Sequence, residues 1–175
     1  MHRLRSIGGM SLNPPRPRTR KLANAEIHTL LQLDIVAHLA TVAADGIPRV
    51  IPIWFVWSDG AFYMTSVDSA RHVVDLQSDP RAAICLDVEA HEPTETGVRP
   101  NASVRARGRA LLSRDVGGDW TRRITQKYVR GEIGRARADY RASIRRTVIE
   151  LRPLHLVSSA TIELVDFGAF GRLGP

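Results

Sequence analysis

The chain has 175 residues, of which 43% are hydrophobic, and it contains one cysteine, Cys85. This length favours one domain with a true core, and a single cysteine excludes an internal disulfide and fits a reducing compartment. No apolar run is long enough to cross a membrane and the N-terminus lacks the apolar segment of a secretory signal, so we expect a cytoplasmic protein.

The net charge of +7 is spread unevenly along the chain. Residues 1–21 carry six basic and no acidic side chains, residues 22–104 sum to −7, and residues 105–146 sum to +9. The basic segment holds few aromatic side chains on which bases could stack. We therefore expect a largely solvated helix face there, and we do not expect nucleic-acid binding.

The chain begins with a stretch that shows no periodicity. Residues 1–20 hold three prolines, two glycines and several arginines, which predicts a disordered or loosely packed basic arm ahead of a domain spanning residues 21–175. Residues 21–34 then place leucine and isoleucine at helical spacing, with Asn24 as the expected N-cap.

Three strands are predicted next, over residues 38–42, 48–57 and 61–66. Asp45-Gly46 and Asp59-Gly60 separate them, and an Asp-Gly pair between apolar runs is a strong hairpin signal. The predicted result is an antiparallel meander. Two prolines in the second strand predict an edge, a bulge or a kink.

The rest of the chain alternates less regularly. A short helix is expected at 69–77, capped by Asp68 or Ser69. The remaining elements are a strand at 82–88, a polar loop at 89–101, a strand at 102–113, one or two helices within 115–146 interrupted near Gly131 and Gly134, and a strand at 147–159 bent at Pro153. Six strands that are mostly consecutive predict a small, mainly β antiparallel barrel with peripheral helices.

Several kinds of site are not expected. The six histidines show no ligand spacing and there is no cysteine pair, so no metal site is predicted. Neither a phosphate-binding Walker loop nor a nucleophile elbow is present.

One segment does suggest a binding site, where the strand at 61–66 leads into the helix. Thr65, Ser66, Ser69 and Arg71 could together hold a phosphate, because hydroxyls and a guanidinium donate hydrogen bonds at a helix N-terminus. The alternative is purely structural, with Ser69 as a cap and Arg71 solvated. Arg49, on the preceding strand of the meander, could reach the same place.

The stretch "HLATVAADGIPRVIPIWFVWSDGAFYMTSVDSARHVVDLQSDPRAAICLDV" resembles the split β-barrel flavin and deazaflavin proteins. These are the pyridoxamine 5'-phosphate oxidase-like superfamily, in particular its branch of deazaflavin-dependent reductases. The resemblance implies a six-stranded antiparallel split β-barrel that forms a homodimer. It also implies an oxidoreductase that transfers hydride between bound FMN, or the deazaflavin coenzyme F-420, and a small organic substrate.

The resemblance also assigns residues, and the chain departs from it at two places. Arg49, Thr65, Ser66, Ser69 and Arg71 would hold the cofactor phosphate, and the backbone of Ile51, Pro52 and Ile53, with Trp54, would face the ring. Pyridoxamine phosphate oxidases have a lysine in place of Trp54 and consecutive basic residues in place of Ala70-Arg71, so oxidation of vitamin B6 is not expected. The choice between FMN and coenzyme F-420 stays open, and arginines of the basic segment would attract the anionic coenzyme tail.

Three further points stay open at the level of the sequence. The same cradle would serve a non-catalytic cofactor-binding or carrier protein. A haem-handling split barrel would need a histidine ligand, for which His38 and His155 are the strand candidates. No catalytic group is assigned, although Tyr128 and His72 are candidates for a general acid.

Overall fold

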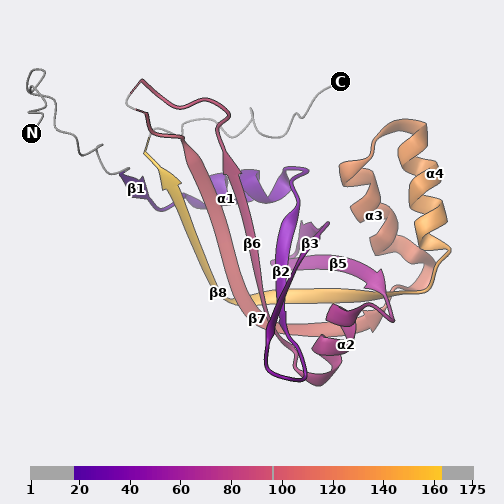
Figure 1. Cartoon of the computed structure of the whole chain (residues 1–175). Helices are drawn as coiled ribbons and strands as arrows, with labels where there is room; N and C mark the ends of the chain where they lie inside the picture. The colour runs from indigo at the N-terminus through magenta and orange to yellow at the C-terminus, as the bar shows by residue number, and fades with distance from the viewer. Residues whose placement is uncertain (1–17, 96, 163–175) are drawn as a thin grey trace, which may run out of the picture.

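The computed structural model describes residues 18–95 and 97–162 (Figure 1). Four α-helices surround one antiparallel sheet: α1 (Asn24–Gln32), α2 (Arg71–Ser78), α3 (Asp119–Tyr128) and α4 (Gly131–Ala142). The strands are β1 (Thr19–Arg20), β2 (Ala37–Val42), β3 (Pro48–Ile53), β4 (Val56–Ser58), β5 (Ala61–Val67), β6 (Arg81–Glu89), β7 (Asn101–Arg114) and β8 (Arg146–Thr161). The sheet runs in the order β3-β2-β6-β7-β8-β5-β4, with β1 paired to β8. A mainly β split barrel with peripheral helices, as predicted, is confirmed.

The long strands β7 and β8 give the barrel its shape. Both curve sharply near their middle, so that one half of the pair continues alongside β6 and the other half alongside β5 (Figure 1). The register of this pair shifts between Arg107 and Gly108, opposite Pro153. A Cβ on Gly108 would lie 2.6 Å from the Arg152 carbonyl oxygen, so only glycine allows this close approach. The predicted bend at Pro153 is confirmed as a bulge.

The predicted second strand, residues 48–57, is divided in two. The chain leaves the sheet at Trp54 and Phe55, and the Phe55 side chain is fully buried. β3 pairs with β2, whereas β4 pairs with β5. β3 and β4 therefore lie at opposite ends of the strand order. The expected meander, with Arg49 on a strand beside Thr65, is therefore wrong. The edge position predicted from the two prolines is right for β3.

The core lies inside the curved sheet. On β6 the alternate residues Ala82, Ile84, Leu86 and Val88 are buried. Phe55, Phe62 and Met64 join them from the β4–β5 hairpin region, and Leu30 and Leu31 do so from α1. The period of two on β6 and the paired leucines of α1 explain why these segments fold as a strand and a helix.

The helix caps differ from the prediction. Ala23, and not Asn24, is the N-cap of α1, because the Glu26 carboxylate accepts a hydrogen bond of 2.7 Å from the Ala23 N–H. α2 begins at Arg71 with Ala70 as its N-cap, so neither Asp68 nor Ser69 caps it. The Asp68 carboxylate instead accepts a hydrogen bond of 2.7 Å from the Thr147 hydroxyl.

The predicted helical interruption lies between α3 and α4. It falls at Val129-Arg130, directly before Gly131, whose φ is +70°. Two residues of the predicted basic arm, Thr19 and Arg20, form β1 against β8, and residues 1–17 lie outside the described part of the chain. No helix in the described ranges has the length and apolar character required to cross a membrane.

Candidate functional site

A pocket of about 470 Å³ opens where β3, β5, α2 and the α3–α4 hairpin meet. Its lining mixes apolar side chains with hydroxyls, an imidazole and two guanidiniums. The lining residues are Val36, Ile51, Pro52, Ile53, Trp54, Thr65, Ser66, Val67, His72, Ile124, Arg141 and Arg146. We refer to this set as the β3–β5 pocket.

Six of the nine residues predicted for a cofactor site line this pocket: Ile51, Pro52, Ile53, Trp54, Thr65 and Ser66. They come together although β3 and β5 are not paired, because the curved sheet brings the two strand ends to one place. Arg49, Ser69 and Arg71 are not among the lining residues. The side chains of Ser69 and Arg71 are exposed.

Arg49 is engaged elsewhere. Its Nε donates to the Asp75 carboxylate at 2.8 Å, and the buried Thr41 hydroxyl donates to the same carboxylate oxygen at 3.0 Å. Burial would raise the pKa of Asp75, but the hydrogen bonds from Arg49 and Thr41 outweigh it and lower the pKa below its usual value. Arg49 thus joins α2 to the β2–β3 hairpin.

Thr65 is held by a chain of hydrogen bonds. Its hydroxyl lies 3.1 Å from that of Thr121, which lies 2.6 Å from the Asp115 carboxylate. A carboxylate only accepts, so Thr121 donates its proton to Asp115 and accepts the proton of Thr65. The Thr65 hydroxyl can therefore accept a hydrogen bond from a ligand in the pocket but has no proton left to donate.

Trp54 and Tyr128 form a stacked pair at one wall. Their ring centroids are 4.6 Å apart with an interplanar angle of 4°, so Tyr128 covers one face of the Trp54 ring, and the Arg141 guanidinium also lies over this ring. The Tyr128 hydroxyl donates to the Ile35 carbonyl at 2.8 Å and accepts from the Phe55 N–H at 3.2 Å. Burial raises the pKa of Tyr128 well above its usual value. Tyr128 therefore fixes the backbone around Trp54 and does not fit the role of a general acid.

His72 is the other candidate acid, and it does line the pocket. Its Nε2 is buried and has no hydrogen-bond partner among the described residues. Burial lowers the pKa of His72, and the opposing effect of the Asp75 charge is smaller. The imidazole is thus neutral near pH 7, with one ring nitrogen available to a ligand.

Two lining arginines were not predicted individually. Arg141 on α4 and Arg146 at the start of β8 belong to the basic segment, which indicated charge there but not which side chains turn inward. The Arg141 guanidinium carbon lies 5.2 Å from the centroid of the Trp54 ring, and its buried Nε has no partner in the described structure. Burial lowers the pKa of both arginines.

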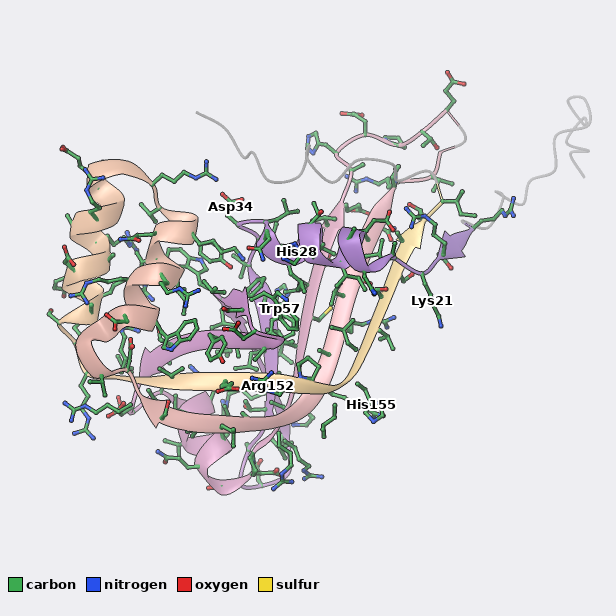
Figure 2. The ribbon with its side chains drawn as sticks, turned by 180° about the vertical axis from the view of Figure 1, so that it is seen from behind. Lys21, His28, Asp34, Trp57, Arg152 and His155 are labelled. Atoms are coloured by element: carbon green, nitrogen blue, oxygen red, sulfur yellow. The ribbon has the colours of Figure 1, made fainter. Side chains whose placement is uncertain are left out.

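A second, mainly apolar surface lies on the face of β2, β6, β7 and β8. It holds two grooves of about 540 and 500 Å³, with exposed Val50, Leu154 and Val157 along them. His38 and His155 both line the second groove, together with Arg105 and Arg107. Figure 2 shows His155 and Arg152 at the bend of β8. We refer to this surface as the apolar face.

Within residues 18–95 and 97–162, no group of three or more His, Cys, Asp or Glu side chains could hold a metal ion.

Solved structures of the same fold include proteins with several ligands. A FAD-binding protein from Mesorhizobium loti is 20% identical, with 84% of this chain and 99% of that chain covered and a TM-score of 0.61. An "F420 Reductase" is 20% identical over 74% and 94% of the two chains, with a TM-score of 0.55. A FAD- and haem-binding protein from Mycobacterium smegmatis is 14% identical over 86% and 77%, with a TM-score of 0.64.

These identities establish a shared fold only. A search of curated proteins returned no significant match. The family comparison is more specific, because the model described as "Pyridoxamine 5'-phosphate oxidase" matches residues 23–158, from the start of α1 almost to the end of β8. The chain therefore belongs to the pyridoxamine 5'-phosphate oxidase family of split-barrel proteins.

Proposed function

We propose that the protein is an oxidoreductase that transfers hydride between a small organic substrate and FMN or the deazaflavin coenzyme F-420 bound in the β3–β5 pocket. The observation that carries this proposal is the pocket itself. The chain belongs to this family, and the pocket lies between the ends of β3 and β5. The buried Nε2 of His72 and Nε of Arg141, two residues that line it, have no hydrogen-bond partner among the described residues. Buried polar groups without partners are costly, and a polar ligand would satisfy them.

The residues present fit such a cofactor. A volume of about 470 Å³ lies within the range of small-molecule sites. Ile51, Ile53 and Trp54 offer an apolar wall for a flat ring, while Ser66, Arg141 and Arg146 offer donors for a polar side chain.

The bound cofactor would supply the hydride chemistry, which explains why the chain needs no nucleophile or metal. The described residues would bind and orient the cofactor and exclude water. His72, neutral and unpartnered at Nε2, is the group that could hold or move a proton at the pocket.

A homodimer is part of the proposal. The apolar face exposes Val50, Leu154 and Val157 on a surface next to the edge strand β3. β3 also contributes Ile51, Pro52 and Ile53 to the pocket, so a partner seated on the apolar face would lie close to the cofactor. The site residues would then be less exposed to solvent in the dimer than in the single chain.

Binding of FMN and of coenzyme F-420 tests the proposal directly, by fluorescence or calorimetry on the purified chain. We expect micromolar or tighter binding of one of them, and oxidation of the reduced bound cofactor by a small carbonyl or enone substrate, which accepts the hydride. Binding without turnover against a substrate panel would favour a carrier protein. Binding of neither cofactor would contradict the proposal.

Haem binding is the second candidate, supported by His38 and His155 in one apolar groove with two arginines that could pair with propionates. Titration with hemin discriminates the two functions. Haem binding would be favoured if the chain binds no flavin and gives a Soret band with hemin that is lost in His155→Ala.

A further inference from the structure

Eight arginines lie between the start of α3 and the start of β8, and two of them differ from the rest because they line the β3–β5 pocket. Arg122, Arg135 and Arg145 form ion pairs with Asp139, Glu132 and Asp68, with N···O distances of 2.8, 3.8 and 2.7 Å. The described ion pairs include no carboxylate partner for Arg141 or Arg146, and these two line the β3–β5 pocket. We propose that Arg141 and Arg146 form the anion subsite of this pocket and hold the phosphate of the bound cofactor.

The Arg146 side chain is fixed against the backbone at the end of α4. The Arg146 Nε donates to the Arg141 carbonyl at 3.1 Å, which orients the Arg146 side chain at the end of α4. The buried Arg141 Nε lacks a partner, and repulsion from Arg146 adds to burial in lowering the pKa of Arg141. An anion bound between the two guanidiniums would accept a hydrogen bond from the Arg141 Nε. Its negative charge would also offset the repulsion between Arg141 and Arg146.

Ser66 completes the subsite. Val67 of β5 pairs with Arg146 of β8, and Ser66, the residue before Val67, lines the pocket together with Arg146. A serine hydroxyl can donate to a phosphate oxygen while the guanidiniums supply charge.

The other residues expected to hold the phosphate are placed differently with respect to the pocket. Thr65 gives its proton to Thr121 and faces the pocket as an acceptor, which would repel a phosphate oxygen. Arg49 is held by Asp75, and Ser69 and Arg71 lie outside the lining. Our proposal therefore assigns the phosphate to Arg141 and Arg146 in place of Arg49, Ser69 and Arg71, which do not line this pocket.

This inference deepens the proposed function, since it assumes that the pocket takes a phosphorylated ring compound. Its ligand class is a phosphate ester, which either FMN or coenzyme F-420 would supply. The acceptor at Thr65 would suit a ligand hydroxyl or N–H on the opposite side of the pocket from the arginines.

The test compares FMN with riboflavin, and coenzyme F-420 with its phosphate-free chromophore, in full-length Arg141→Gln and Arg146→Gln. We expect each substitution to weaken the phosphorylated ligand about tenfold or more and its phosphate-free form less than about threefold. Arg71→Gln and Arg135→Gln are the matched controls and should leave both affinities unchanged. Equal losses for phosphorylated and phosphate-free ligands, or a phosphate-specific loss in Arg71→Gln alone, would overturn the inference.

A second measurement separates this inference from the proposed function. Pyrophosphate should raise the melting temperature of the wild-type chain but not that of the Arg141→Gln Arg146→Gln double variant. If this holds while no flavin or deazaflavin binds, the anion subsite stands and the proposed function falls. If pyrophosphate stabilises both chains equally, or stabilises neither, the anion subsite is wrong.

Discussion

Lys127 carries a charge that the fold partly buries, and no carboxylate of residues 18–95 or 97–162 forms an ion pair with it. Its Nζ donates to the Leu31 carbonyl at 3.2 Å, near the end of α1, and lies 3.8 Å from the centroid of the Phe55 ring. Burial lowers the pKa of Lys127 to about 8, and the attraction of Asp34 offsets this only in part. The Leu31 carbonyl and the face of the Phe55 ring contact the ammonium group but leave much of the burial cost uncompensated.

The depressed pKa predicts a dependence of stability on pH. Between pH 8 and 10.5 the unfolded chain binds more protons at Lys127 than the folded chain does, so the free energy of unfolding rises with pH across this window. Below pH 8 the full cost of the buried charge is present. Relative to Lys127→Met, the wild-type chain should gain about 2–3 kcal/mol between pH 8 and 10.5 in urea titrations.

Lys21, the other lysine of the chain, supplies the control. Its side chain is exposed, and Figure 2 shows it at the end of the molecule where β1 leads into α1. Lys21→Met should leave the pH profile unchanged. A wild-type profile identical to that of Lys127→Met would mean that the ammonium group is solvated in the folded chain.

At the scale of the elements, the α3–α4 hairpin positions Arg141. Its two helices pack side by side at one end of the sheet (Figure 1). A Cβ on Gly134 would lie 1.9 Å from the Val129 carbonyl oxygen, so α4 can start in this direction only with glycine there. The ion pair between Arg122 and Asp139, at 2.8 Å, joins the helices further along.

Gly134→Ala should therefore disturb both folding and the pocket. We expect a loss of about 2–3 kcal/mol in the free energy of unfolding, because backbone must move to admit the methyl group. The displaced α4 should also weaken binding of FMN or coenzyme F-420, whichever binds the wild-type chain. Ala136→Ser, at an exposed position of the same helix, should change stability by less than about 0.5 kcal/mol. Wild-type stability in Gly134→Ala would show that the turn is not tightly constrained.

Local chemistry explains which elements could be predicted. The Asp-Gly turns and the bend at Pro153 follow from backbone preferences of a few adjacent residues, and they appear where expected. The division of β3 from β4 does not follow from such local preferences, because Phe55 leaves the strand and fills a core that is assembled from distant segments. The site follows the same rule. The position of Thr65 and Ser66 before a helix indicated these two residues, and the family resemblance indicated Ile51–Trp54, whereas Arg141 and Arg146 reach the pocket only through tertiary packing.

At the scale of the whole molecule, the sheet presents two different surfaces on either side of β3. One borders the β3–β5 pocket, and the other is the apolar face, where Val50 is 62% and Val157 is 54% exposed. An open antiparallel edge beside exposed valines is a liability for an isolated chain, and pairing with a second copy would remove it. The two features together support the proposed homodimer.

Charges placed on this face should separate the subunits. Val50→Glu Val157→Glu would bury two carboxylates per chain in an apolar contact, a cost that a dimer of ordinary size could not absorb. We expect sedimentation equilibrium to give a dimer for the wild-type chain and a monomer for the double variant. Leu111→Glu, at a β7 position that is 65% exposed and lines neither groove, should remain dimeric. If the wild-type chain sediments as a monomer, or the double variant as a dimer, the apolar face is not the interface. If cofactor affinity falls together with dimerisation, the partner subunit closes the pocket across β3.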